Sequence, residues 1–232
     1  MERTVRTRSG PRFLIADDHA IFAETFRGFL ELHYPVVGIV TDGRKLVVEA
    51  VRLKPDVLIV DIGMPLLNGL EAARRIHESC PSIKFVFLTM QDNPNLAAAA
   101  MQVGTAAFVL KNSGGEEVLT AIDHVLRGRS YLTPKLRSED WVEAKARARQ
   151  FATELTPRQR DVLQLFAEGR SMKEIASVLD LSEKTIEFHK RHIMDSFGVR
   201  SNAGLVLFAL SHGLISMNPQ SVHIPGLHTG VA

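Results

Sequence analysis

The chain has 232 residues, which is enough for one large domain or two small ones. Apolar residues make up 45% and charged residues 23%, so we expect a soluble chain that can bury a core, and no apolar run reaches the ~18–20 residues that cross a bilayer. The single cysteine, Cys80, can form no internal disulfide, and no apolar stretch follows the arginine-rich start as a signal peptide would require. We therefore expect a cytoplasmic protein with no membrane partner.

From residue 12 to residue 127, short apolar runs alternate with helical patterns. Each run is followed by apolar residues at a spacing of three or four, which is typical of an amphipathic helix. The apolar runs cover residues 13–16, 36–40, 57–60, 83–88 and 106–110. Runs that are apolar throughout favour parallel strands buried on both faces. The pattern predicts an α/β, doubly wound, five-stranded parallel sheet.

Polar side chains stand at the ends of four of these predicted strands. In chain order they are Asp17 and Asp18, Asp61, Thr89, and Lys111. Each has an ordinary explanation when taken alone, such as a helix cap, a turn or a solvated lysine. Ligands bind beyond the carboxyl ends of parallel strands, so we expect these side chains to meet in one crevice. Because all four strand ends carry side chains that suit one site, we favour a functional site over four separate ordinary explanations.

The residue types in this crevice predict metal and phosphoryl chemistry. Carboxylates brought together repel one another unless a cation joins them, and hard oxygen ligands suit Mg²⁺. The expected metal ligands are Asp17, Asp18, Asp61 and the backbone carbonyl of Gly63. Asp61 is the candidate nucleophile for an aspartyl phosphate. Lys111 would pair with a phosphate oxygen, and the Thr89 hydroxyl would donate to another. We expect no further cofactor.

The charge pattern changes after this first part. Residues 13–126 carry fourteen acidic and nine basic side chains, whereas residues 127–149 carry seven basic and three acidic ones. Such a change in composition indicates a boundary between parts with different roles. We interpret residues 128–153 as a linker, and we expect flexible ends at residues 1–11 and 216–232.

The pattern after the linker is helical throughout, and it predicts a small all-α, four-helix domain at residues 154–215. Thr156 reads as the N-cap of its first helix, and Ser182 as the N-cap of its third, which ends at Gly198. Residues 153–213 carry eight basic and eight acidic side chains. That balance is unusual for a DNA-binding domain, because neutral surfaces release few counterions.

The first part of the chain, residues 12–127, resembles the receiver domain of two-component response regulators. The resemblance rests on Ile15–His19, Val60–Pro65, Gly69–Ala72, Phe87–Thr89 and Gly104–Lys111. It implies a flavodoxin-like fold and transfer of a phosphoryl group from a sensor histidine kinase to Asp61. It also implies a switch through Thr89 and the ring of Phe108. A receiver loses its phosphoryl group slowly, and this slow loss limits how long the signal lasts. The resemblance therefore implies a regulator, and we expect no metabolic enzyme.

Residues 154–215 resemble the C-terminal helix-turn-helix domain of LuxR/NarL-type regulators. The resemblance rests on Glu154–Leu163, Gly169, Lys173–Ala176, Leu181–Ser182, Lys184–Ile186, His189, Ile193 and Phe197–Ser201. It implies that the helix after Ser182 enters the major groove of double-stranded DNA, and that the helix from Ser201 to His212 forms a homodimer. The expected DNA contacts are Lys184, Thr185, Glu187, Phe188, Lys190 and Arg191.

The favoured interpretation is a transcription factor in which phosphorylation of Asp61 controls dimerisation or domain release, and through it sequence-specific DNA binding. Two alternatives stay open. A protein-interaction module would fit the neutral helical domain, with Glu187 and Asp195 on its third helix. A metal-dependent phosphatase would also use an aspartate nucleophile, but Gly63 stands where such an enzyme needs a second acid.

Overall fold

The computed structural model describes residues 10–137 and 141–215. The predicted ends, residues 1–11 and 216–232, therefore lie outside the described residues except for Gly10 and Pro11. The chain divides into two compact units, Met1–Arg147 and Ala148–Ala232. Within the described part of the chain, no helix is both long and apolar enough to cross a membrane.

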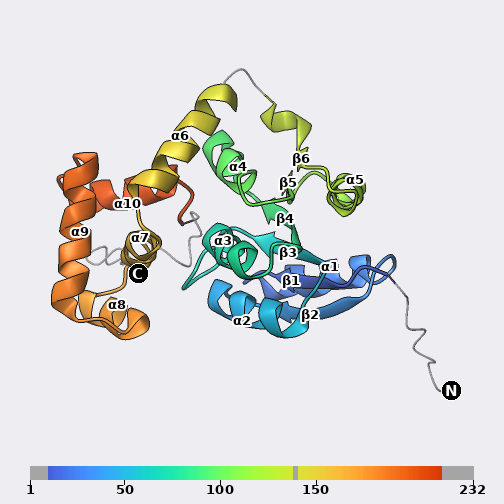
Figure 1. Ribbon diagram of the computed structural model, residues 1–232, viewed down its shortest axis with the longest axis horizontal. Helices are drawn as coiled ribbons and strands as arrows, with labels where there is room; N and C mark the ends of the chain where they lie inside the picture. Colours follow the sequence, from blue (N-terminus) through green and yellow to red (C-terminus); the bar gives the residue numbers. More distant parts are fainter. Residues whose placement is uncertain (1–9, 138–140, 216–232) are drawn as a thin grey trace, which may run out of the picture. The chain divides into compact units, whose positions relative to one another are not determined.

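The first unit contains a parallel sheet with helices on both faces (Figure 1). Its strands are β1 (Phe13–Ala16), β2 (Val36–Val40), β3 (Val57–Asp61), β4 (Lys84–Thr89), β5 (Ala106–Leu110) and β6 (Tyr131–Leu132). Its first helices are α1 (Ala20–Leu30), α2 (Gly43–Leu53), α3 (Gly69–Ser79), α4 (Pro94–Ala100) and α5 (Gly115–Leu126). The strand order is β2-β1-β3-β4-β5-β6, and every strand pair is parallel. The predicted doubly wound α/β class is confirmed.

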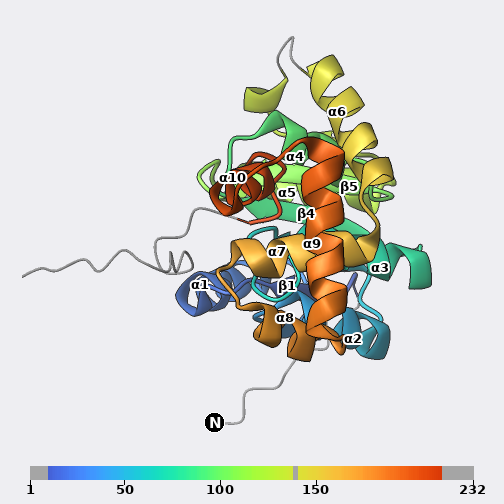
Figure 2. The ribbon, with the colours of Figure 1, turned by 90° about the vertical axis from the view of Figure 1, so that its left-hand side faces the viewer.

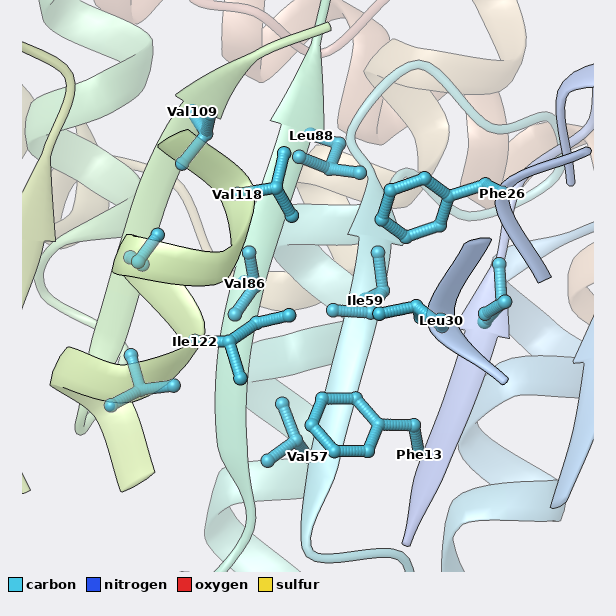
Figure 3. Packing of buried hydrophobic residues seen from close by; sticks show 14 of the residues in the cluster. Phe13, Phe26, Leu30, Val57, Ile59, Val86, Leu88, Val109, Val118 and Ile122 are labelled. Carbon is cyan, nitrogen blue, oxygen red and sulfur yellow. The ribbon is translucent and has the colours of Figure 1, made fainter. Parts of the chain in front are cut away.

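The sheet and the helices α1 and α5 enclose a hydrophobic core (Figure 3). Phe13 and Ile59 of the central strands are buried against Leu30 of α1 and Ile122 of α5. The buried strands β1, β3 and β5 are apolar at every position up to Asp61, because helices cover both faces of the sheet. This packing holds the carboxyl ends of the strands in register at one edge.

The predicted number of five strands is wrong, because β6 adds a sixth beside β5. Tyr131 pairs with Ala107, and Leu132 pairs with Phe108. Two residues are too few to show a period of two, so no sequence pattern marks this strand. The segment predicted as a linker thus holds β6, the 3₁₀ helix η1 (Pro134–Leu136) and most of helix α6 (Trp141–Glu154). The division between the two units falls within α6, and the predicted domain boundaries stay a prediction.

In the described part of the second unit, four helices follow α6, as predicted (Figure 2). They are α7 (Pro157–Ala167), α8 (Met172–Leu179), α9 (Glu183–Phe197) and α10 (Asn202–Ser211). The predicted N-caps are present, since the Thr156 and Ser182 side chains accept hydrogen bonds from backbone N–H groups in the first turns of α7 and α9. Gly198 ends α9 at φ +64°, a left-handed conformation that favours glycine.

Candidate functional site: an acidic pocket and an exposed helix

The structure brings four of the five predicted polar residues at the strand ends, Asp17, Asp18, Asp61 and Lys111, together in one pocket. Lys111 follows β5, and its Nζ lies 2.7 Å from Oδ2 of Asp17 and 2.9 Å from Oδ2 of Asp61. One ligand atom from each of Asp17, Asp18, His19 and Asp61 lies within 4.8 Å of the others. Three strands therefore deliver carboxylates and an ammonium group to the same point.

Burial dominates the electrostatics of this pocket. Burial raises the pKa of Asp61 above its usual range, although Lys111 acts in the opposite direction. Burial also raises the pKa of Asp18, against a lowering by His19. For Lys111, burial lowers the pKa, but the carboxylates of Asp61 and Asp17 outweigh it and the pKa is raised. The lysine thus stays charged, and the three carboxyl groups of Asp17, Asp18 and Asp61 outnumber it, an arrangement that an additional cation would stabilise.

The two predicted switch residues lie on neighbouring strands beside the pocket. Thr89 is 1% exposed, and its Oγ1 accepts a hydrogen bond from the N–H of Gln91 at 3.1 Å. Phe108 is completely buried on β5, opposite Phe87 of β4. The positions of both residues fit a switch, and their movement stays a prediction.

The backbone of the β3–α3 turn shapes the pocket around Asp61. The N–H of Gly63 donates to Oδ1 of Asp61 at 3.3 Å. Asn68 caps α3 by accepting the N–H of Glu71 at 2.8 Å. Gly69 begins that helix so close to β3 that a Cβ there would lie 2.1 Å from the carbonyl oxygen of Asp61. The turn therefore bonds the Asp61 carboxylate through the N–H of Gly63 and leaves no room for a side chain at position 69.

In the second unit, α9 presents a mixed face. Lys184, Glu187, Phe188 and Arg191 are exposed. Arg191 Nη2 lies 3.3 Å from Oε1 of Glu187, one helical turn away. Phe188 is 66% exposed, and its ring stacks on that of His192 with centroids 6.2 Å apart. The exposed face thus carries an internal ion pair, an aromatic pair and Lys184.

Two of the predicted DNA-contact residues, Lys190 and Thr185, are only partly exposed. The Nζ atom of Lys190 lies over the ring of Phe166, 4.4 Å from its centroid, and burial lowers the pKa of this lysine. Lys190 is four residues after the buried Ile186, so helical periodicity turns it toward the core side. Thr185 is half-buried, and its hydroxyl lies 2.8 Å from that of Ser182.

Comparisons with known proteins identify both units. Residues 13–123 match the response regulator receiver domain family, and residues 153–209 match the bacterial regulatory proteins of the luxR family. The oxygen regulatory protein NreC of Staphylococcus carnosus is 34% identical over 214 residues, covering 88% of this chain and 99% of NreC. The chain belongs to the LuxR-type response regulators. The transcriptional regulatory protein MctR of Rhizobium johnstonii is 30% identical over 207 residues, covering 88% of this response regulator and 95% of MctR.

Solved structures agree with this family. The response regulator is similar to RcsB of Salmonella typhimurium, described for its conformational dynamism in DNA interaction, with 30% identity and a TM-score of 0.60. That comparison covers 88% of this chain and 98% of RcsB. A structure of RcsB from Salmonella enterica serovar Typhimurium, bound to a promoter in the presence of phosphomimetic BeF₃⁻, has 28% identity and a TM-score of 0.59. That comparison covers 87% of this chain and 98% of the promoter-bound RcsB chain.

The pocket of this response regulator fits a divalent cation. Its donors are mostly carboxylate oxygens, which suit a hard cation. The Oδ1 atom of Asp18 is buried and makes no hydrogen bond within the described residues, although Nδ1 of His19 lies 3.0 Å away. A cation coordinated there would supply the partner that this oxygen lacks.

Sequence reasoning assigned no role to two residues of the pocket, His19 and Phe22. His19 Nδ1 lies 3.0 Å from Asp18 and 4.0 Å from Oδ2 of Asp61, and its place directly after the two aspartates was an available signal. The ring of Phe22 lies 4.5 Å from Nζ of Lys111, a cation–π distance. No sequence pattern reports that contact, because α1 and the end of β5 are far apart in the chain.

Proposed function

We propose that this response regulator accepts a phosphoryl group on Asp61 from a sensor histidine kinase in the cytoplasm, and that phosphorylation controls DNA binding. Control would act through dimerisation or through release of the DNA-binding domain. The observation that carries the proposal is the contact of Lys111 with Asp17 and Asp61 beside the unsatisfied oxygen of Asp18. We place the receiver at residues 12–127, the linker at 128–153 and the DNA-binding domain at 154–215.

The residues of the pocket have separate roles in this transfer. An Oδ atom of Asp61 forms the new O–P bond as the N–P bond of the phosphohistidine breaks. Lys111, already 2.9 Å from Asp61, pairs with a phosphoryl oxygen, and the Thr89 hydroxyl donates to another. Mg²⁺ supplies positive charge to these oxygens when it is bound. The proposed Mg²⁺ ligands are Asp17, Asp18, Asp61 and the carbonyl of Gly63.

Replacing Asp18 by asparagine is expected to stabilise the metal-free protein and to remove the stabilisation that Mg²⁺ confers. Because burial raises the pKa of Asp18, its ionised form costs stability at neutral pH, and the cost disappears as the pH falls through that pKa. Thermal unfolding with and without Mg²⁺ measures both effects. The exposed Asp123 supplies the control variant, Asp123→Asn, which should keep the Mg²⁺ shift. A full Mg²⁺ shift in Asp18→Asn would contradict the ligand assignment.

For the second unit we propose double-stranded DNA as the ligand of α9 and a homodimer through α10. The support is the family match together with RcsB, whose structures include two dimers bound to two parallel DNAs. Leu207 of α10 is 62% exposed, an apolar group available for a partner. The proposed contacts on α9 remain the predicted set, Lys184, Thr185, Glu187, Phe188, Lys190 and Arg191. With Arg191 paired to Glu187 and Lys190 turned inward, binding by a monomer should be weak.

Replacing Glu187 by glutamine is expected to tighten binding to random-sequence duplex DNA, whereas Arg191→Gln should weaken it. The first change removes a negative charge and frees Arg191, and the second removes the positive charge itself. Each effect should be about 1 kcal/mol, or roughly fivefold in affinity, near a phosphate. Fluorescence anisotropy over a range of salt concentrations measures them. If neither variant nor the parent protein bound DNA at any salt concentration, the protein-interaction alternative would be favoured instead.

A further inference from the structure

Residues 131–137, which we call the strap, form β6 and η1 and attach to the strand that carries Phe108. The N–H of Thr133 donates to the carbonyl oxygen of Phe108 at 2.9 Å. In the parallel pairing of β5 and β6, Leu132 lies opposite Phe108. A shift of the backbone at Phe108 must therefore move the strap or break this hydrogen bond.

Side chains fix the strap to α5 and to itself. Thr133 is 1% exposed, and its hydroxyl donates to Oε1 of Glu117 at 2.5 Å. The hydroxyl of Tyr131 donates to the same oxygen at 3.3 Å. Arg137 closes the segment, because its Nε and Nη2 donate to the carbonyl of Leu132 at 3.2 and 3.0 Å. The first residues of the proposed linker are thus bonded to α5 and β5.

The strap also contacts the segment that follows Thr89. Lys135 Nζ lies 2.5 Å from Oδ2 of Asp92, in the turn between β4 and the N-cap of α4 at Asn93. The same turn holds Gln91, whose N–H donates to the Thr89 hydroxyl. An exposed ion pair contributes little stability by itself, so the backbone bond at Thr133 is the stronger attachment. One seven-residue segment therefore bonds beside both proposed switch residues.

We propose that the strap transmits the phosphorylation state of the receiver to the DNA-binding unit, an inference that rests on the proposed function. The chain runs on from the strap to α6, and the second unit begins within that helix. Rearrangement at Thr89 and Phe108 changes the hydrogen bond and the ion pair that hold the strap. The two receiver states then differ in how firmly they hold the start of the connection, and such a difference couples two distant sites.

Two substitutions at one position separate the backbone bond from the side-chain bond. Thr133 has φ −49° and ψ 133°, close to the conformation that a proline ring imposes. Leu132 before it lies in a strand, which is the backbone region that a following proline requires. Thr133→Pro therefore removes the N–H that bonds Phe108 with little backbone strain. Thr133→Val keeps that N–H and loses only the hydroxyl.

The experiment compares DNA affinity before and after treatment with acetyl phosphate and Mg²⁺, using a duplex selected from a random-sequence library with the phosphorylated full-length protein. Allosteric coupling typically changes affinity by about 5–150-fold. Thr133→Pro should be labelled like the wild type and bind DNA equally before labelling, but its gain should fall to about twofold or less. Thr133→Val should keep most of the gain. An unchanged gain in Thr133→Pro would overturn the strap proposal alone.

Other outcomes have separate meanings. A wild-type protein that takes no label, or that gains no affinity on labelling, would overturn the proposed function and the inference with it. If Thr133→Pro lost its fold by circular dichroism, Asp92→Asn and Lys135→Gln would provide the test. Each removes the ion pair at the protein surface, and each should reduce the gain without changing the labelling. Full gain in both of these variants would overturn the proposal in that case.

Discussion

Replacing Asp61 by asparagine is expected to abolish phosphoryl labelling by acetyl phosphate or by a histidine kinase. An amide has no anionic oxygen to form the acyl phosphate, so the new O–P bond cannot form at this position. Labelling is measured by the mass of the intact protein, with Asp123→Asn as a control that keeps full labelling. Persistent labelling of Asp61→Asn would remove Asp61 from the central role.

The Asp61→Asn variant should remain folded, so that loss of label reports chemistry. Burial raises the pKa of Asp61, which means that its charge is costly in the folded protein at neutral pH. Lys111 loses one partner but keeps Asp17, 2.7 Å away. Circular dichroism and the midpoint of thermal unfolding check this point.

Replacing Gly69 by alanine is expected to destabilise the receiver by about 3 kcal/mol or more and to impair labelling. A Cβ at Gly69 would lie 2.1 Å from the carbonyl oxygen of Asp61 and 2.5 Å from Cγ1 of Val60. Neither the β3 backbone nor the buried valine can yield without moving Asp61. Chemical denaturation measures the loss of stability, and acetyl phosphate measures the labelling.

Gly28 on α1 provides the matched control for this substitution. A Cβ there would meet no atom within 4 Å, and the residue lies inside a helix. Gly28→Ala should therefore stabilise the protein by roughly 0.5–1 kcal/mol, since alanine favours helices. Equal effects of the two substitutions would show that close approach at β3 is not the reason for glycine at position 69.

Much of the first site could be predicted because parallel topology gathers distant residues. Once the apolar runs are read as parallel strands, Asp17, Asp61 and Lys111 must lie at the same edge of the sheet. Helix caps can be predicted equally well, because Thr156 and Ser182 accept hydrogen bonds from residues three positions away. The sequence therefore predicted the elements and the meeting of these residues.

Other features depend on tertiary contacts that no local pattern records. Strand β6 exists because Thr133 and its neighbours bond to β5 and Glu117, not because two residues favour a strand. Helical periodicity places Lys190 on the core side of α9, but the contact of its Nζ with the ring of Phe166 depends on the packing of α7. Likewise Phe22 reaches Lys111 only after α1 has packed on the sheet. These contacts form only in the folded chain, so they could not be predicted from the sequence.

The most direct test of phosphoryl transfer is to locate the phosphoryl group itself. Wild-type protein is treated with acetyl phosphate and Mg²⁺, the acyl phosphate is reduced with borohydride, and the modified residue is found by peptide mass spectrometry. We predict modification at Asp61 and at no other residue of the pocket. Modification at Asp17 or Asp18 in its place, or none at all, would contradict the account.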